Sequence, residues 1–209
     1  MAGTTLGRAA GTVWRHLLWR GIDDPRRIDS AEIELAPDWL LARGETVLPD
    51  YRLTWSLTTG PGFVTETLRA AVDGGTWSRR LTLHRDASGR WSDEAEARGE
   101  LEGQPPPGLV DDAYALDGAL DCELGPATVT MPVRRLGLHT GDPVPRHEAL
   151  VARVEVPSLA VLPARRSYGR GPGGAVRLDT LDHPWSRADL LVDADGLVLE
   201  FPTIARRIT

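Results

Sequence analysis

The sequence predicts an all-β fold, mainly antiparallel, of the sandwich, barrel or roll type and with little helix. Three observations carry this prediction. Apolar and polar residues alternate with a period of two in many short runs, which is the pattern of half-buried strands. Glycine (22 residues) and proline (16 residues) are spread along the whole chain and interrupt it before long helices can form. Strand-like runs recur at spacings of roughly ten to fifteen residues, as in antiparallel all-β domains.

The individual strands are predicted in order from this alternation. Leu53, Trp55 and Leu57 alternate with polar neighbours, and similar runs follow at residues 64–72, 80–84 and 151–156. Two tight turns join neighbouring runs: Asp86-Ala87-Ser88-Gly89 and Ala194-Asp195-Gly196. An Asp-Gly pair between alternating runs is typical of a β-hairpin. The sequence therefore predicts a hairpin at each of these two turns.

Bulk composition limits the classes of protein that need to be considered. A chain of 209 residues with 41% hydrophobic and 26% charged residues is typical of a soluble globular protein, and we expect one domain over residues 1–209. The proline-rich residues 103–108 are interpreted as a surface loop. The net charge of −6 disfavours nucleic acid as a partner. No apolar run reaches the ~20 residues of a membrane span, so a cytoplasmic location is expected.

Catalytic and metal-binding signatures are weak. All basic residues are arginine, which leaves no lysine for Schiff-base chemistry. The single cysteine, Cys122, excludes an intrachain disulfide and is expected to be buried and unreactive. The five histidines are not paired at metal-binding spacing. We therefore expect no catalytic residue, no metal and no cofactor.

Residues 116–138 concentrate charge of both signs. If residues 116–124 form a strand, Asp117, Asp121 and Glu123 share one face. Pro126 and Pro132 are predicted to exclude a helix from the connection that follows. Arg134 and Arg135 would then lie on an extended segment, where only one of the two can meet the acidic face. The hypothesis favoured for this region is a structural ion-pair network with five members: Asp117, Asp121, Glu123, Arg134 and Arg135.

The same segment resembles the bacterial family named "Putative glycolipid-binding", long described as a domain of unknown function. That family has a motif close to DGxxDxDL…TPxTNTLPIRRL. This chain carries Asp117-Gly118, Asp121-Cys122-Glu123-Leu124 and Thr128-Val129-Thr130-Met131-Pro132-Val133-Arg134-Arg135-Leu136. Further matches are Val-Pro-Ser-Leu at residues 156–159, Tyr168, and VDADGLVLEFPTIARR at residues 192–207. The resemblance covers most of the chain and is strongest after Asp117.

The resemblance implies a single-domain spiral β-roll that binds a lipid-like or glycolipid-like molecule in a cavity or groove. Two positions depart from the family pattern. Val129 replaces an asparagine, and Arg166 replaces a glutamine two residues before Tyr168. If those amides contact a ligand, this chain binds a different one; if they tie loops together, the change is compensated locally.

Our first hypothesis is a non-enzymatic protein that binds a small amphipathic molecule, with the polar head of the ligand placed by arginines. It is expected to be a monomer or a weak homodimer. The residues predicted to line the cavity are Trp55, Trp77, Arg134, Tyr168 and Trp185. Two alternatives remain open. One is a hydrolase or lyase that uses Asp121 and Glu123 as general acid and base. The other is a protein-interaction module with an exposed strand edge or apolar patch.

Overall fold

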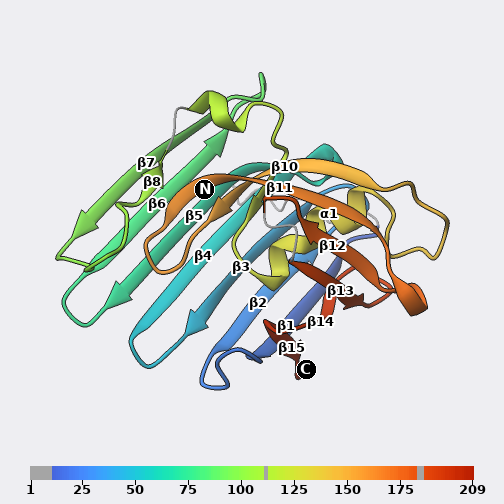
Figure 1. Cartoon of the computed structure of the whole chain (residues 1–209), viewed down its shortest axis with the longest axis horizontal. Coiled ribbons are helices and arrows are strands. Elements are labelled where there is room, and N and C mark those ends of the chain that lie inside the picture. The colour runs from blue at the N-terminus through green and yellow to red at the C-terminus, as the bar shows by residue number, and fades with distance from the viewer. Residues whose placement is uncertain (1–10, 111–112, 183–185) are drawn as a thin grey trace, which may run out of the picture.

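The structure is a computed structural model that describes residues 11–110, 113–182 and 186–209. It confirms the prediction of an all-β fold, and the strands form a spiral roll of two layers (Figure 1). The first layer is an antiparallel meander of seven strands. They are β1 (Val13–Gly21), β2 (Ile28–Leu35), β3 (Leu40–Val47), β4 (Tyr51–Gly60), β5 (Val64–Gly74), β6 (Ser78–Arg85) and β7 (Trp91–Arg98).

The second half of the chain forms shorter strands that curl back over one face of the meander. They are β8 (Gly108–Leu109), β9 (Asp121–Glu123), β10 (His147–Val154), β11 (Ala160–Arg170), β12 (Val176–Thr180), β13 (Arg187–Val192), β14 (Val198–Phe201) and β15 (Ala205–Arg207). The helical elements are α1 (Thr130–Arg135) and the 3₁₀ turns η1 (Pro61–Phe63), η2 (Ala113–Leu116), η3 (Pro126–Val129) and η4 (Pro172–Gly174).

One continuous hydrogen-bonded path links both layers. Its order is β7-β6-β5-β4-β3-β2-β1-β15-β14-β13-β12-β11-β10-β9, and β8 pairs with β11. The connection between layers is β15, which pairs with β1 through Trp19 and Arg207. From there the sheet turns over, so that β10 and β11 cross the face of the meander while β5–β7 extend beyond them (Figure 1).

Strand alternation decides which side chains enter the core. Leu53 and Leu57 are buried, as predicted for β4, and Trp55 between them is partly buried against the same cluster. The main core lies between the meander and β9–β11, and its largest fully buried side chains are Trp19 and Trp91. Close packing of large side chains fills the space between the layers.

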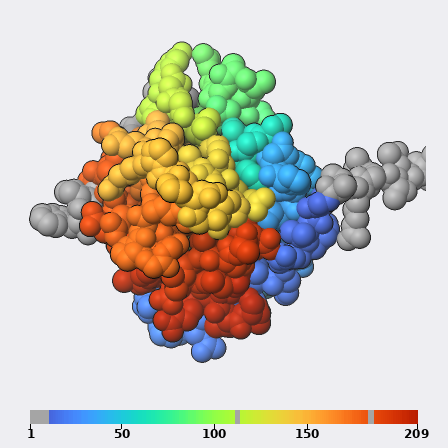
Figure 2. Space-filling model, turned by 90° about the vertical axis from the view of Figure 1, so that its right-hand side faces the viewer, coloured from blue at the N-terminus to red at the C-terminus, as the bar shows by residue number. Residues whose placement is uncertain are grey.

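A second, smaller core forms around α1. Val133 and Leu138 pack there against Tyr168 and Leu190 from the overlying strands. Figure 2 shows this side of the molecule, where α1 and its following loop (yellow) lie against the C-terminal strands (red). The helix is therefore held between the two halves of the chain and is not a surface addition.

Both predicted hairpins are present. β6 and β7 pair through the turn that contains Asp86, whose carboxylate accepts hydrogen bonds from the backbone N–H groups of Ser88 and Arg90. β13 and β14 pair through the turn that begins at Asp193, and this carboxylate accepts from the N–H groups of Asp195 and Leu197. Aspartate side chains that hydrogen-bond the backbone two residues on stabilise such turns.

The prediction for residues 116–138 was wrong in two respects. The expected strand over residues 116–124 is only β9, because η2 and a turn at Gly118 (φ +87°) precede it. The exclusion of a helix was also wrong, because α1 contains Pro132 within its first turn. Proline is tolerated there, since the N–H groups of the first turn have no partner within the helix. Arg134 and Arg135 are therefore helical.

Candidate functional site

The central segment contains a buried pair between Asp121 of β9 and Arg135 of α1. Arg135 Nη1 donates to Asp121 Oδ1 at 2.9 Å, and Nη2 donates to the second carboxylate oxygen. Only 3% of the Asp121 side chain is exposed. Burial raises the pKa of Asp121 above its ordinary value, and the hydrogen bonds from Arg135 oppose that rise.

A second pair joins Glu123 of β9 to Arg166 of β11. The distances are 2.8 Å from Arg166 Nε to Glu123 Oε2 and 2.6 Å from Nη2 to Oε1. Sequence reasoning noted Arg166 as a departure from the family pattern but did not assign it to the ion-pair network. The other departure, Val129, lines a hollow together with Glu123. The two substituted positions therefore meet at one place in the fold.

Two members of the expected network lie elsewhere. Asp117 is exposed after η2, and it forms no ion pair with any residue that the structure describes. The Arg134 guanidinium lies 5.4 Å from the centre of the Phe63 ring, and its Nη1 is 3.4 Å from the Asp195 carbonyl oxygen. Consecutive helical residues point about 100° apart, which explains why Arg135 reaches a carboxylate and Arg134 does not.

The hollow at the central segment has a volume of only about 10 Å³. Tyr168 lines it, and burial together with Glu123 and Asp121 holds the pKa of this phenol well above 10.0. Cys122 is buried beside it, where burial raises the thiol pKa to about 12. Both carboxylates are engaged by two arginine N–H groups each, so this arrangement fixes β9, β11 and α1 rather than presenting a free acid or base.

The five residues predicted to line one cavity lie in different parts of the fold. Tyr168 belongs to the small core at α1, and Arg134 stacks on Phe63. Trp77 packs against Tyr51 with ring centroids 6.5 Å apart, under the guanidinium of Arg79. Trp185 lies outside the described residues. Of the four that the structure describes, Tyr168 lines the small hollow at the central segment, and Trp55 borders a different hollow, between the meander and residues 124–128.

That hollow lies between β2–β4 and the segment that leads into η3. Its apolar wall comes from Trp19, Leu53 and Trp55 on the meander, and its other side is formed by residues 124–128. The Trp55 indole packs closely on Gly44, where an added Cβ would stand 2.7 Å from the ring. The volume of the hollow is about 20 Å³, close to that of one water-sized site.

Two polar side chains lie at this apolar hollow. Asp29 of β2 and Thr46 of β3 face each other across the strands, and Thr46 Oγ1 donates to Asp29 Oδ1 at 2.5 Å. Arg27 Nε approaches the other carboxylate oxygen at 3.2 Å. Burial nevertheless raises the pKa of Asp29 above 3.8, because desolvation outweighs both hydrogen bonds. We call this site the Asp29 pocket.

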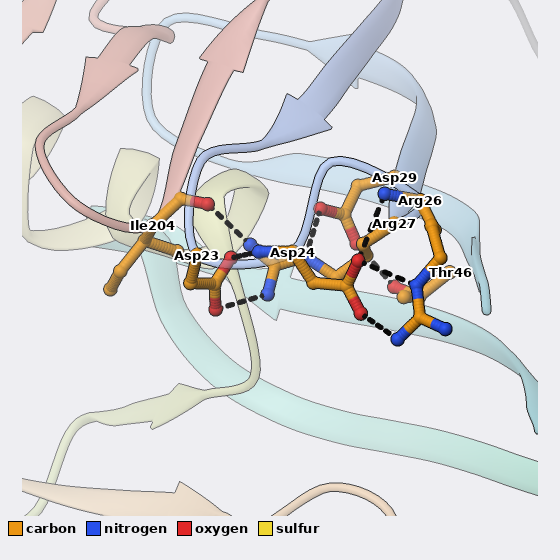
Figure 3. A network of polar contacts seen from close by, with 7 residues as sticks. All are labelled: Asp23, Asp24, Arg26, Arg27, Asp29, Thr46 and Ile204. Atoms are coloured by element: carbon orange, nitrogen blue, oxygen red, sulfur yellow. Dashed lines mark hydrogen bonds and ion pairs between the residues drawn. The ribbon is translucent and has the colours of Figure 1, made fainter.

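Arg27 connects the Asp29 pocket to the surface of the roll (Figure 3). Its Nη1 donates to Asp23 at 2.7 Å, and its Nη2 donates to the carbonyl oxygen of Ile204 at 2.5 Å. Arg27 thereby shares its five donors among two carboxylates and the turn between β14 and β15. Burial raises the pKa of the nearby Tyr51 phenol, and the charges of Arg27 and Asp29 also act on it.

Convergent polar groups with shifted pKa values at an apolar hollow are a physical signature of a binding site. The Asp29 pocket has this signature, and sequence reasoning found only Trp55 of it. Sequence reasoning missed Asp29 and Arg27 because both lie in a charged segment at the start of a strand, and such a segment is usually exposed to solvent. No group of His, Cys, Asp and Glu side chains that could hold a metal ion is found among the described residues.

Comparisons with known proteins place the chain in a family. A solved structure that it resembles is a DUF1089 family protein from Pseudomonas aeruginosa, determined by crystallography at 1.80 Å. The two share 26% sequence identity with a TM-score of 0.65, over 86% of this chain and 92% of the other. Among curated proteins no match is found. Within the described part of the chain, no helix has the length and apolar character needed to cross a membrane. The family model described as "Putative glycolipid-binding" matches residues 16–207, so the chain belongs to that family.

Proposed function

We propose that the protein is a non-catalytic binding protein for a small amphipathic molecule, and that the Asp29 pocket receives it. The apolar part of the ligand lies between the layers, against Trp55 and Leu53. Its polar head lies at the mouth of the pocket, near Arg27 and Tyr51. The family description supports a lipid linked to a polar head as the class of ligand.

The observation that carries this proposal is the pair Asp29 and Thr46, placed at the edge of an apolar hollow between two tryptophans. A buried carboxylate that serves only to hold two strands together is replaceable by apolar packing. Here it lies next to a space with aromatic walls, and it can accept hydrogen bonds from the hydroxyl groups of a ligand head. The sequence analysis expected Arg134 to place the polar head; in this proposal Arg27 has that role, because it lies at the Asp29 pocket.

A ligand larger than one water molecule requires the pocket to widen. In this proposal the wall formed by residues 124–128 moves, because the opposite wall belongs to hydrogen-bonded strands of the meander. Movement of this wall away from Trp55 would extend the hollow along the inner face of β4. The size of the widened space would then limit the length of the apolar chain of the ligand.

Tryptophan fluorescence tests the proposal. We expect the emission of Trp55 and Trp19 to shift when the protein is titrated with lysolipids and glycolipids below their micellar concentrations. Trp55→Phe should remove most of the shift while leaving the fold intact. Ala127→Leu should fill the hollow and weaken binding at least tenfold, a loss of about 1.4 kcal/mol. Ala87→Leu, in the exposed turn after β6, is the matched control and should bind normally.

Overpacking at Ala127 can also reduce stability, so urea unfolding of each variant accompanies the titrations. Transfer of nuclear Overhauser effects from the ligand to Trp55 provides a second readout that does not depend on a variant. The proposal is overturned if no amphiphile in the panel changes the fluorescence. It is also overturned if ligand binding is the same in Ala127→Leu and in the unchanged protein.

A further inference from the structure

The face of the meander that points away from the second layer carries a long groove. One hollow of about 730 Å³ extends over β4–β7, and a second of about 310 Å³ extends over β1–β4. The two hollows share Thr54 and Trp55 and together cross all seven strands. With strands about 4.8 Å apart, six spacings give a length of about 29 Å. We call this feature the outer trough.

Two cross-strand rows of side chains border the outer trough. Register places Ser56, Arg69, Thr82 and Glu94 in one row, on β4 to β7. Thr54, Ala71, Arg80 and Glu96 form the parallel row two residues along each strand. In these rows the side chains on β4 are short, those on β7 are charged, and those on β5 and β6 include both kinds.

The charged side chains of this face fall into two groups. Arg43 and Arg80 are paired, with Glu32 and Asp73 respectively. Arg69 and Glu94 flank Thr82 on either side, and their side chains form no ion pair or hydrogen bond with any described residue. An unpaired donor on β5 and an unpaired acceptor on β7 therefore border the trough, where a ligand would contact them.

The hydroxyl groups of the trough are also without protein partners. None of Thr54, Ser56 and Thr82 hydrogen-bonds through its side chain to another residue in the described chain. Each hydroxyl can both donate and accept, whereas Arg69 only donates and Glu94 only accepts. A ligand that matches this set needs many groups that do both, which is the property of a saccharide.

Other classes of ligand fit the outer trough less well. The lining contains three arginines (Arg43, Arg69 and Arg80) and four glutamates (Glu32, Glu45, Glu94 and Glu96), a balance that repels a polyanion such as nucleic acid. An added peptide strand needs an exposed sheet edge, and the trough lies on a sheet face. An acyl chain would have to desolvate these charges.

We propose that the outer trough binds an uncharged oligosaccharide chain, lying across strands β4–β7 with its hydroxyl groups hydrogen-bonded to Arg69, Thr82 and Glu94. This site is on the opposite face of the meander from the Asp29 pocket, and it does not depend on the function proposed there. Recognition through hydrogen bonds at an open groove implies weak affinity, because each bond replaces one to water.

Calorimetric titration of the full chain with maltohexaose, cellohexaose and hexa-N-acetylchitohexaose tests the proposal, with chemical-shift mapping by NMR. At least one of these saccharides should bind and shift the signals of Ser56, Arg69 and Thr82. Ala71→Trp should block the trough and abolish binding. Arg69→Ala and Glu94→Ala should each weaken binding about fivefold to tenfold. Ala87→Trp is the matched control and should bind as the unchanged protein does.

The outcomes separate this proposal from the one above. Ala71→Trp should leave the fluorescence response to amphiphiles unchanged, and Ala127→Leu should leave saccharide binding unchanged. If none of the three saccharides binds at millimolar concentration, the proposal is overturned. Binding that persists in Ala71→Trp, or that shifts signals only outside the trough, also overturns it.

Discussion

Two buried aspartates of this fold, Asp121 and Asp29, differ in the number of hydrogen bonds that they accept from arginine. Asp121 meets both terminal nitrogens of Arg135, so each carboxylate oxygen has a charged donor. Asp29 receives one N–H of Arg27 at 3.2 Å and one hydroxyl, while Arg27 directs its other nitrogens to Asp23 and Ile204. Burial raises the pKa of both carboxyl groups.

The surroundings of the two carboxylates also differ in volume and polarity. At Asp121 the hollow is about 10 Å³ and the neighbouring strands and helix are tied together through charges. At Asp29 the hollow is about twice that volume, its walls are aromatic and aliphatic, and an arginine with divided contacts leads to the surface. This comparison indicates that a fully satisfied pair is a structural element, whereas an incompletely satisfied carboxylate at an apolar wall can exchange partners with a ligand.

The largest effect is expected from removing the partner of Asp121. Arg135→Met leaves a buried carboxylate without its cation, and we expect a loss of about 3–5 kcal/mol in the free energy of unfolding. Urea unfolding at neutral pH measures it. The double variant Asp121→Leu with Arg135→Met should recover most of the loss, because apolar packing can replace a buried pair. A loss below about 1 kcal/mol in the single variant would contradict a structural role for this pair.

A smaller effect is expected at Asp29, and it should depend on pH. Because burial raises the pKa of Asp29, the folded state binds its proton more tightly than the unfolded chain. This carboxyl therefore favours the fold at pH below 3.8, and that contribution is lost as the pH rises through the folded pKa. Asp29→Asn removes the titration while keeping an acceptor for Thr46.

The stability of the unchanged protein relative to Asp29→Asn should thus fall as the pH is raised from 3.8 towards neutral. Urea unfolding of both proteins at several pH values gives this difference directly. A difference that stays constant over that range, or that rises with pH, would show that Arg27 and Thr46 dominate over burial. In that case the protein partners of Asp29 would satisfy its charge, and Asp29 would not be the incompletely satisfied carboxylate of this comparison.

The smallest effect is expected at Asp24, which also belongs to the network of Figure 3. Its carboxylate accepts hydrogen bonds from the Arg26 guanidinium at 2.8 and 3.0 Å, and these lower its pKa to about 2. This pair is exposed to solvent, where water and salt screen the attraction. Asp24→Ala should leave the urea midpoint near neutral pH unchanged. A clear drop in the midpoint would show that the exposed part of the network supports Asp29 through Arg27.

Regular alternation made the meander predictable, and its absence from residues 116–138 explains why the prediction for that segment was wrong. The runs around Leu53 and Leu81 form strands. Successive side chains of a strand point to opposite faces of the sheet, so the alternation of apolar and polar residues is visible directly in the sequence. The central segment combines a three-residue strand, a 3₁₀ turn and a six-residue helix, each too short to leave a period. Pro132 was interpreted as a helix breaker. Proline is tolerated only in the first turn of a helix, and the sequence does not show where this helix begins.

The candidate sites were predictable to a lesser degree. Trp55 was predicted from residue type and alternation. Arg27, Asp29 and Thr46 were not predicted. Nothing in the neighbouring sequence shows that a polar residue near the end of a strand will be covered by a distant part of the chain. The pairing of Glu123 with Arg166, 43 positions away in sequence, also depends on how β9 and β11 are placed by the roll.

The sequence by itself determined the all-β class, the two hairpins at Asp86 and Asp193, and the family. Each of these depends on residues close together in the chain, or on an ordered set of motifs. The tertiary structure alone decided which arginine meets which carboxylate, which tryptophan borders a hollow, and which face of the meander remains open. These features depend on contacts between strands distant in sequence, and only the closure of β15 against β1 brings those strands together.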